Sequence, residues 1–83
     1  MKLDGSKVLV IGGGGFIGSQ VVAELLKTNV AEVRVYDNFA RGKKENLNSS
    51  LEDSRCSIWP HGGDIREIDL LNDAMEGMDG VIH

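Results

Sequence analysis

Short apolar runs recur along this chain at intervals that suit the strands of a sheet. Residues 7–11 form a nearly continuous run of apolar and β-branched side chains that stops at glycines, a pattern typical of a strand buried on both faces of a parallel sheet. Residues 32–37 alternate polar and apolar side chains and predict a second strand that ends at Asp37. Residues 56–59 predict a third short strand, and residues 80–83 begin a fourth.

Amphipathic stretches separate these strands. Apolar side chains at positions i, i+1, i+4 and i+5 predict a helix over residues 15–28, and apolar side chains recur at helical spacing over residues 68–75. Residues 38–46 are polar and predict a loop, followed by a weak helical turn within residues 45–54. This alternation predicts an α/β fold, in which right-handed crossovers place about four parallel strands in the order 3-2-1-4 between flanking helices.

The length of 83 residues limits this fold, because most domains contain roughly 100–150 residues. We therefore expect residues 1–83 to be the amino-terminal part of one domain, with the remainder of that domain and a substrate domain absent. A chain this short hides only about 60 % of its unfolded surface when it folds, so exposed apolar surface is also expected.

Charge and cysteine content narrow the choice of partner and compartment. Residues 45–83 carry two Lys or Arg against nine Asp or Glu, which argues against nucleic acid, because nucleic-acid binding needs a basic face. No apolar run approaches the roughly 18 residues that span a bilayer, so no membrane partner is expected. Cys56 is the only cysteine, which fits the reducing cytoplasm. His61 and His83 have no partner at metal-ligand spacing, so no metal site is predicted.

The glycines after the first strand carry the strongest chemical signal. Gly12, Gly15 and Gly18 satisfy the pattern G-x-x-G-x-x-G between a buried strand and an amphipathic helix. Such a turn needs a positive φ at Gly12, a backbone at Gly15 that can approach a pyrophosphate, and no side chain at Gly18 where helix meets strand. A flexible linker is the alternative, but the large apolar Phe16 and Ile17 follow directly and favour a docked helix whose free N–H groups bind phosphate.

Asp37 adds a second element, 19 positions after Gly18. A carboxylate at about this spacing accepts hydrogen bonds from an adenosine ribose and repels a 2′-phosphate, which favours NAD over NADP. Arg41, Lys43 and Lys44 oppose this preference, because nearby cations can accommodate a 2′-phosphate, although they lie farther along the loop. A turn-forming role at the strand end is the structural alternative for Asp37.

Asp64 and Ile65 follow the third predicted strand and form a third element. In one interpretation the carboxylate accepts the adenine amino group while Ile65 covers the ring. In the other, Asp64 is the N-cap of the next helix and Glu67, three residues on, completes a capping box. From the bare sequence the two roles have equal weight.

Three segments together resemble the extended short-chain dehydrogenases, the NAD-dependent epimerase/dehydratase family that acts on nucleotide sugars. They are residues 8–19, residues 37–47 and residues 63–66, so the resemblance covers nearly the whole chain. It implies a partial Rossmann fold, NAD as cofactor, and three groups of contacts. The implied contacts are the backbone of Phe16 and Ile17 on the pyrophosphate, the segment Asp37, Asn38, Phe39, Arg41 and Gly42 around the adenosine ribose, and Asp64 and Ile65 on the adenine.

The chain departs from the pattern of that family in several places. Ile11 stands where a Thr or Ser is usual, and Gly14 replaces a common alanine. The family's chemistry uses a Tyr-x-x-x-Lys pair with a Ser or Thr, whereas Tyr36, the only tyrosine here, is followed four positions later by Ala40. We therefore expect no catalytic residue within these 83 residues.

The resemblance predicts the NAD-binding portion of a nucleotide-sugar epimerase or dehydratase, whose parent enzyme transfers a hydride transiently from a sugar hydroxyl to NAD. The alternative from another class is a non-catalytic nucleotide-binding module, or one that completes its sheet against another chain. Hydroxysteroid dehydrogenases share the extended fold, so a steroid or other alcohol remains open as substrate. The expected partners are NAD and, for the parent enzyme, a nucleotide sugar, and assembly as a homo-oligomer remains open.

Overall fold

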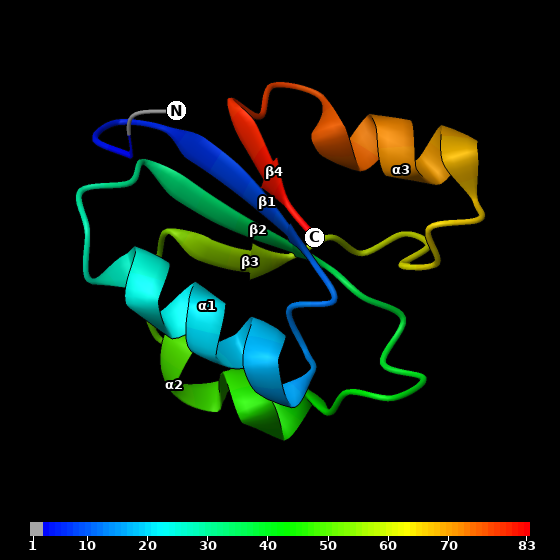
Figure 1. Ribbon diagram of the computed structural model, residues 1–83, viewed down its shortest axis with the longest axis horizontal. Coiled ribbons are helices and arrows are strands. Elements are labelled where there is room, and N and C mark those ends of the chain that lie inside the picture. The colour runs from blue at the N-terminus through cyan, green and yellow to red at the C-terminus, as the bar shows by residue number, and fades with distance from the viewer. Residues whose placement is uncertain (1–2) are drawn as a thin grey trace.

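The computed structural model describes residues 3–83, which form one parallel sheet with helices on both sides (Figure 1). The strands are β1 (Lys7–Ile11), β2 (Glu32–Tyr36), β3 (Cys56–Ile58) and β4 (Gly80–Ile82). They lie in the order β3-β2-β1-β4, and each neighbouring pair is parallel. The predicted strand order is confirmed.

Helices cover both faces of the sheet, as the alternation predicted (Figure 1). On one face lie α1 (Phe16–Leu26) and α2 (Asn48–Leu51), and α3 (Ile68–Met75) covers the other. A 3-10 turn, η1 (Lys44–Leu47), runs directly into α2, so the weak helical turn predicted within residues 45–54 is confirmed. The predicted first helix is shorter than expected at both ends.

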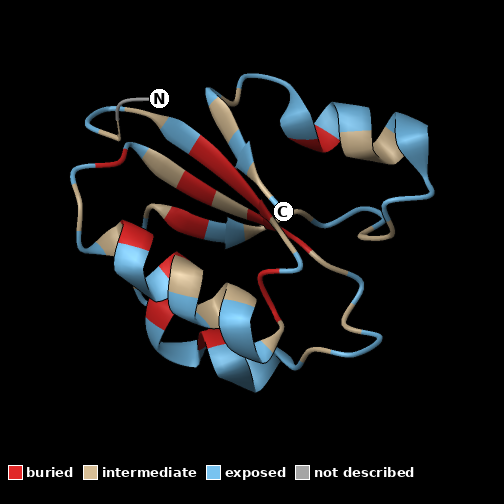
Figure 2. Ribbon diagram, in the orientation of Figure 1, coloured by how far each residue is buried: buried red, intermediate tan, exposed pale blue. Residues whose placement is uncertain are grey.

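Each face of the sheet has its own buried cluster. Figure 2 colours red the buried residues, which lie on the strands and on the helices of both faces. Toward α1 and α2, the valines of β1 and β2 are at most 2 % exposed. Toward α3, Leu9, Tyr36 and Ala74 are fully buried. A fully buried Val or Leu side chain contributes about 1.5–3 kcal/mol. Burial on both faces therefore fixes β1 and β2, and with them the loops that leave their carboxyl ends.

Arg55 stabilises the carboxyl end of α1, which lies away from the loops that follow β1 and β2. Its guanidinium donates hydrogen bonds to the carbonyl oxygens of Leu26, the last residue of α1, and of Thr28 and Val30, which follow the helix. It also forms an ion pair with Asp53, with 2.7 Å between Nη2 and Oδ2. The hydrogen bonds from the side chain and backbone of Arg55 lower the pKa of the Asp53 carboxyl to about 2.

The cysteine is a buried strand residue, as predicted. Cys56 is 6 % exposed in β3, and its burial, together with the negative charge of Asp53, raises the pKa of the thiol. No disulfide is formed by this lone residue.

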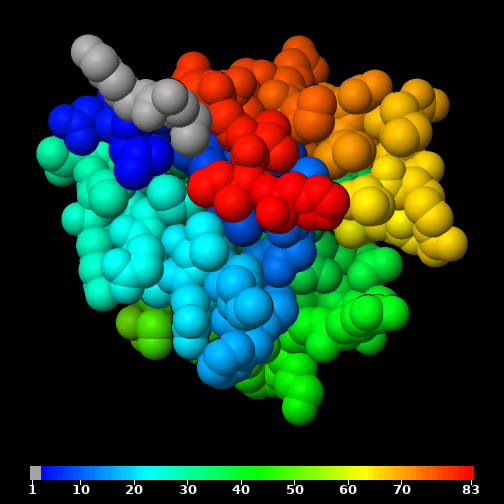
Figure 3. Space-filling view, in the orientation of Figure 1, coloured from blue at the N-terminus to red at the C-terminus, as the bar shows by residue number. Residues whose placement is uncertain are grey.

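Apolar surface remains uncovered, as expected for a chain of this length. Phe16 and Ile17 are 74 % and 75 % exposed at the start of α1, and Val81 of β4 is 45 % exposed. Figure 3 shows the end of the chain, in red, uncovered between α1 and α3. Among residues 3–83, no helix has both the length and the apolar character needed to cross a bilayer.

Candidate functional site

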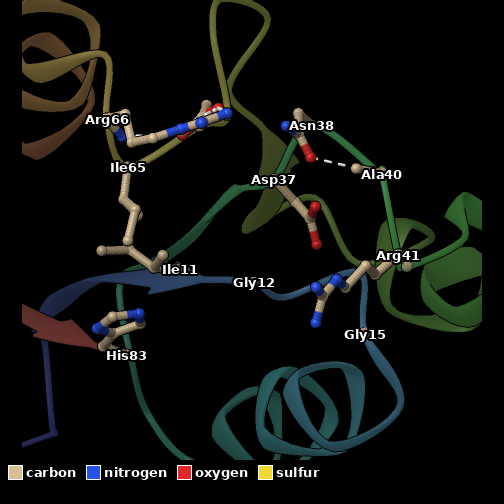
Figure 4. Close-up of a pocket in the computed structure, with 13 residues that line it drawn as sticks. Ile11, Gly12, Gly15, Asp37, Asn38, Ala40, Arg41, Ile65, Arg66 and His83 are labelled. Carbon is tan, nitrogen blue, oxygen red and sulfur yellow. Dashed lines mark hydrogen bonds and ion pairs between the residues drawn. The ribbon is translucent and has the colours of Figure 1, made fainter.

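A cavity of about 600 Å³ opens at the carboxyl ends of the strands (Figure 4). Three loops meet there, and they follow β1, β2 and β3 in turn. In parallel α/β sheets this edge is where ligands bind, beside the point at which the strand order reverses. The cavity is lined by Ile11, Gly12, Gly15, Asp37, Asn38, Ala40, Arg41, Gly42, Gly63, Asp64, Ile65, Arg66 and His83.

The glycine turn has the geometry that the sequence predicted. Gly12 has a φ of +76°, and the N–H of Gly15 donates to its carbonyl oxygen at 3.1 Å, which closes the turn. A Cβ placed on Gly18 would overlap that same carbonyl oxygen. The absence of a side chain at Gly18 therefore lets the first turn of α1 lie directly on the glycine turn. This ordered packing excludes the flexible linker.

The amino end of α1 is prepared to receive an anion. The N–H groups of Phe16, Ile17 and Gly18 have no acceptor among residues 3–83, and no acidic side chain lies in the first turn of this helix of 11 residues. The helix dipole adds a partial positive charge at this end. The exposed side chains of Phe16 and Ile17 do not line the cavity. The predicted contact of these two residues with phosphate is made by their backbone N–H groups. Because their side chains point outward, these N–H groups stay accessible to a ligand.

Asp37 lies at the junction between the glycine turn and the loop after β2. Its Oδ2 accepts a hydrogen bond from the N–H of Gly14 at 2.8 Å, and its Oδ1 accepts one from the N–H of Phe39 at 2.7 Å. Each carboxylate oxygen has two lone pairs, so both oxygens can accept a further hydrogen bond. Asp37 thus combines the turn-forming role with a position in which it can meet a ligand. The neighbouring Asn38 accepts the N–H of Ala40 at 3.0 Å.

Arg41 and Phe39, two of the residues implied to surround the ribose, lie differently from each other. Arg41 lines the same cavity as Asp37, and Figure 4 shows the Arg41 guanidinium extended on the side where Gly12 and Gly15 lie. Phe39 does not line this cavity. Its ring packs instead against the buried cluster beneath α1, with Lys44 Nζ 5.7 Å from the ring centroid. Spacing in the sequence could show neither the direction of the long Arg41 side chain nor the left-handed backbone of Phe39.

The loop after β3 is tied to β2 by the backbone and by a tyrosine. The Tyr36 hydroxyl donates to the carbonyl oxygen of Asp64 at 3.1 Å. Gly63, with a φ of 112°, packs so closely on the backbone of Asp37 and Asn38 that a Cβ would overlap it. The adenine-binding segment implied by the resemblance is therefore held against the segment implied to bind the ribose.

The N-cap interpretation of Asp64 is wrong. The Asp64 carboxylate accepts the N–H of Arg66 at 2.9 Å and forms an ion pair with the guanidinium at 2.6 Å. These hydrogen bonds lower the pKa of Asp64 to about 2. The N–H of Glu67 closes a separate turn onto the Asp64 carbonyl, so α3 begins only at Ile68, with Glu67 in the N-cap position. The adjacent Ile65 is 45 % exposed and extends toward Ile11 (Figure 4).

The structure thus brings eight of the twelve predicted site residues to one cavity and adds others. Phe16, Ile17, Gly18 and Phe39 lie outside its lining, and the added residues are Ile11, Ala40, Gly63, Arg66 and His83. Ile11 and His83 come from the carboxyl ends of β1 and β4, which are neighbours, so the predicted strand order contained the signal that places them there. The sequence predicts His83 only as part of the fourth strand.

Comparisons with known proteins agree with this geometry. Residues 9–83 match the family model described as the 3-beta hydroxysteroid dehydrogenase/isomerase family. UDP-glucose 4-epimerase of Rickettsia prowazekii (strain Madrid E) is 30 % identical over 80 residues, which are 92 % of this chain and 23 % of that protein. UDP-glucuronic acid decarboxylase 3 of Arabidopsis thaliana is 40 % identical over 55 residues, which are 66 % of this chain and 16 % of that protein.

A solved structure confirms the Rossmann fold. The Bordetella bronchiseptica enzyme WbmF, in complex with NAD+ and UDP, superposes with a TM-score of 0.77 and 30 % identity over 95 % of this chain and 22 % of that chain. This chain spans less than a quarter of the length of these three relatives. By its match over residues 9–83 the chain belongs to the 3-beta hydroxysteroid dehydrogenase/isomerase family, within the extended short-chain dehydrogenases that include the NAD-dependent epimerases and dehydratases.

Proposed function

We propose that this chain forms the adenosine and pyrophosphate half of an NAD site in an enzyme that acts on a nucleotide sugar. The observation that carries the proposal is the meeting of three loops, distant in sequence, around one cavity at the carboxyl edge of the sheet. WbmF has the same fold over 95 % of this chain, and its structure contains NAD+ and UDP. This supports the choice of ligand.

Each loop has one task in this proposal. The pyrophosphate lies at the amino end of α1, where free N–H groups and the helix dipole favour negative charge. Asp37 accepts hydrogen bonds from the ribose through lone pairs that the backbone leaves free. Ile65 covers the adenine, and Asp64 accepts its amino group. When bound, NAD would accept a hydride from the carbon of a sugar hydroxyl and later return it, while these residues bind and orient the dinucleotide.

We further propose that residues 1–83 are the amino-terminal part of one NAD-binding domain, with the cytoplasm as its compartment. The small share of each relative that the chain matches supports the first point, and the lone free thiol supports the second. A nucleotide sugar is favoured over a steroid alcohol because two of the relatives are named for UDP-sugars and the solved structure of WbmF contains UDP.

Calorimetric titration with NAD tests the proposal, and two isoleucines provide a matched pair of variants. Ile65 lines the cavity and is 45 % exposed, whereas Ile68 lies on α3 outside it and is 59 % exposed. Ile65→Ser is expected to weaken NAD binding about fivefold, because loss of apolar contact with one ligand group costs about 1 kcal/mol. Ile68→Ser should bind NAD as the unaltered protein does.

The ligand itself supplies a second control. ADP keeps the adenosine and the pyrophosphate, so Ile65→Ser should weaken its binding as it weakens that of NAD, whereas nicotinamide mononucleotide, which has neither group, should bind far more weakly than NAD. Absence of any NAD binding by the folded protein, or equal weakening by the two isoleucine substitutions, would contradict the proposed site.

A further inference from the structure

Gly14 connects the glycine turn to the loop after β2 by three hydrogen bonds. Its N–H donates to Asp37 Oδ2 at 2.8 Å, and its carbonyl oxygen accepts the N–H of Lys43 at 3.0 Å and Nδ2 of Asn46 at 2.9 Å. All three partners belong to the loop and to η1, which follows it directly. These hydrogen bonds therefore fix the spacing between the glycine turn and the loop without help from a bound ligand.

Phe39 occupies the space beside Gly14. A Cβ on Gly14 would overlap Cε1 of the Phe39 ring, and it would lie 2.8 Å from Cδ1 and 2.9 Å from Asp37 Oδ2. Real Cβ atoms do not approach other atoms so closely, because packed interiors leave no room for such overlap. The ring thus fills the volume that a methyl group at position 14 would need.

The backbone of Phe39 shows that this placement is enforced. Phe39 has a φ of 59°, and it is the only residue other than glycine with a positive φ among those the structure describes. A bulky side chain rarely adopts this left-handed conformation, and it persists only where surrounding contacts fix it. Here the contacts are the hydrogen bond from its N–H to Asp37 and the packing of the ring against the cluster beneath α1.

We propose that Gly14 and Phe39 are a matched pair that sets the position of the Asp37 loop on the glycine turn, and that Phe39 is thereby a positioning residue for the dinucleotide. This rests on the proposed NAD site. The ligand must contact the turn through its pyrophosphate and the loop through its ribose, so a shift of one against the other lowers its affinity. The pair also gives a reason for Gly14 in this chain, where the resembled family commonly has alanine.

A cycle of single and double substitutions tests the pair. Gly14→Ala is expected to weaken NAD binding about tenfold, within the range of coupling energies for residues in contact. In the background of Phe39→Ala, the methyl group no longer meets the ring and keeps only its 2.9 Å approach to Asp37 Oδ2, the end of a side chain, so it should weaken NAD binding clearly less than tenfold. Titration calorimetry gives the affinities, and thermal unfolding shows that each variant is folded.

Gly13 supplies the matched control. A Cβ on Gly13 would lie 2.8 Å from Val35 Cγ1 and makes no close approach to Phe39. Gly13→Ala should therefore be no better tolerated when Phe39 is alanine than when it is phenylalanine. The amide proton of residue 14 adds a spectroscopic readout, since its hydrogen bond to Asp37 should weaken in Gly14→Ala and recover in the double variant.

The outcomes separate this inference from the proposed function. If the unaltered protein binds NAD but the methyl group at position 14 has the same effect in both backgrounds, the pair is refuted and the NAD site stands. If the folded, unaltered protein binds no NAD, the proposed function and the positioning role both fail. A smaller effect of the methyl group in the Phe39→Ala background than beside Phe39, confined to position 14, supports the pair.

Discussion

Tyr36→Phe removes one oxygen atom and leaves the packing of the ring intact. The ring is fully buried on the α3 face of the sheet, and its hydroxyl donates to the carbonyl oxygen of Asp64 at 3.1 Å. This bond joins β2 directly to the loop that we propose as the adenine site. Its loss therefore tests whether the sheet holds that loop in place.

The size of the effect follows from the geometry of this single bond. A neutral hydrogen bond contributes about 0.5–1.5 kcal/mol net, so we expect the free energy of unfolding to fall by about 1 kcal/mol. For a domain of this size that lowers the melting temperature by about 4–8 °C. If the Asp64 loop loosens by the same free energy, NAD binding weakens up to about fivefold.

Thermal unfolding by circular dichroism and calorimetric titration with NAD measure the two effects. Val30→Ala is the control, because Val30 is buried, 3 % exposed, and lies before β2, away from the cavity. It removes the equivalent of two buried methylene groups, about 1.6 kcal/mol, and should lower the melting temperature without changing the NAD affinity. A Tyr36→Phe protein that melts and binds NAD like the unaltered one would refute the role of this hydrogen bond.

Three further changes test other parts of the structure. Gly18→Ala places a methyl group against the backbone of the glycine turn, so it should lower the free energy of unfolding by about 1–3 kcal/mol and abolish NAD binding, as denaturant titration and calorimetry would show. Asp37→Asn should reduce the ratio of NAD to NADP affinity, whereas Glu45→Gln, which removes the same charge outside the cavity, should not; an unchanged ratio in Asp37→Asn would contradict the assignment. The Asp53 pKa of about 2 lies below its usual 3.8, so the stabilisation from this carboxylate is present above about pH 4 and is lost as the pH falls toward 2. Arg55→Gln should return that pKa toward 3.8 in a carboxyl NMR titration and reduce this loss; a pKa that stays near 2 would exclude Arg55 as its cause.

The strand order and the glycine turn were predictable because both depend on local chemistry. Apolar runs ending at glycines define strands, the handedness of crossovers fixes their order, and a positive φ at Gly12 follows from the need for a tight turn. The position of Asp37 also follows, because the residue after a strand lies at the carboxyl edge of the sheet. These predictions needed no knowledge of side-chain packing.

The remaining parts depend on contacts between segments far apart in sequence. The N-cap hypothesis for Asp64 failed because Arg66 binds the carboxylate first, and sequence spacing cannot rank these two donors. Phe39 lies outside the cavity because its ring packs on Gly14, a contact across 25 residues. His83 joins the cavity only because β4 pairs with β1.

The buried thiol of Cys56 offers a way to measure the opening of β3, the strand at one edge of the sheet. Cys56 lies in β3, which pairs with β2 alone. The raised pKa of the thiol and its burial protect it from alkylation while β3 is in place. Reaction with a thiol reagent therefore requires local opening, and its rate at low reagent concentration reports how often β3 separates from β2. Because the loop after β3 carries Asp64 and Ile65, ligand binding at that loop should slow the labelling of Cys56. The labelling rate of this one native residue would then report how well the site is ordered.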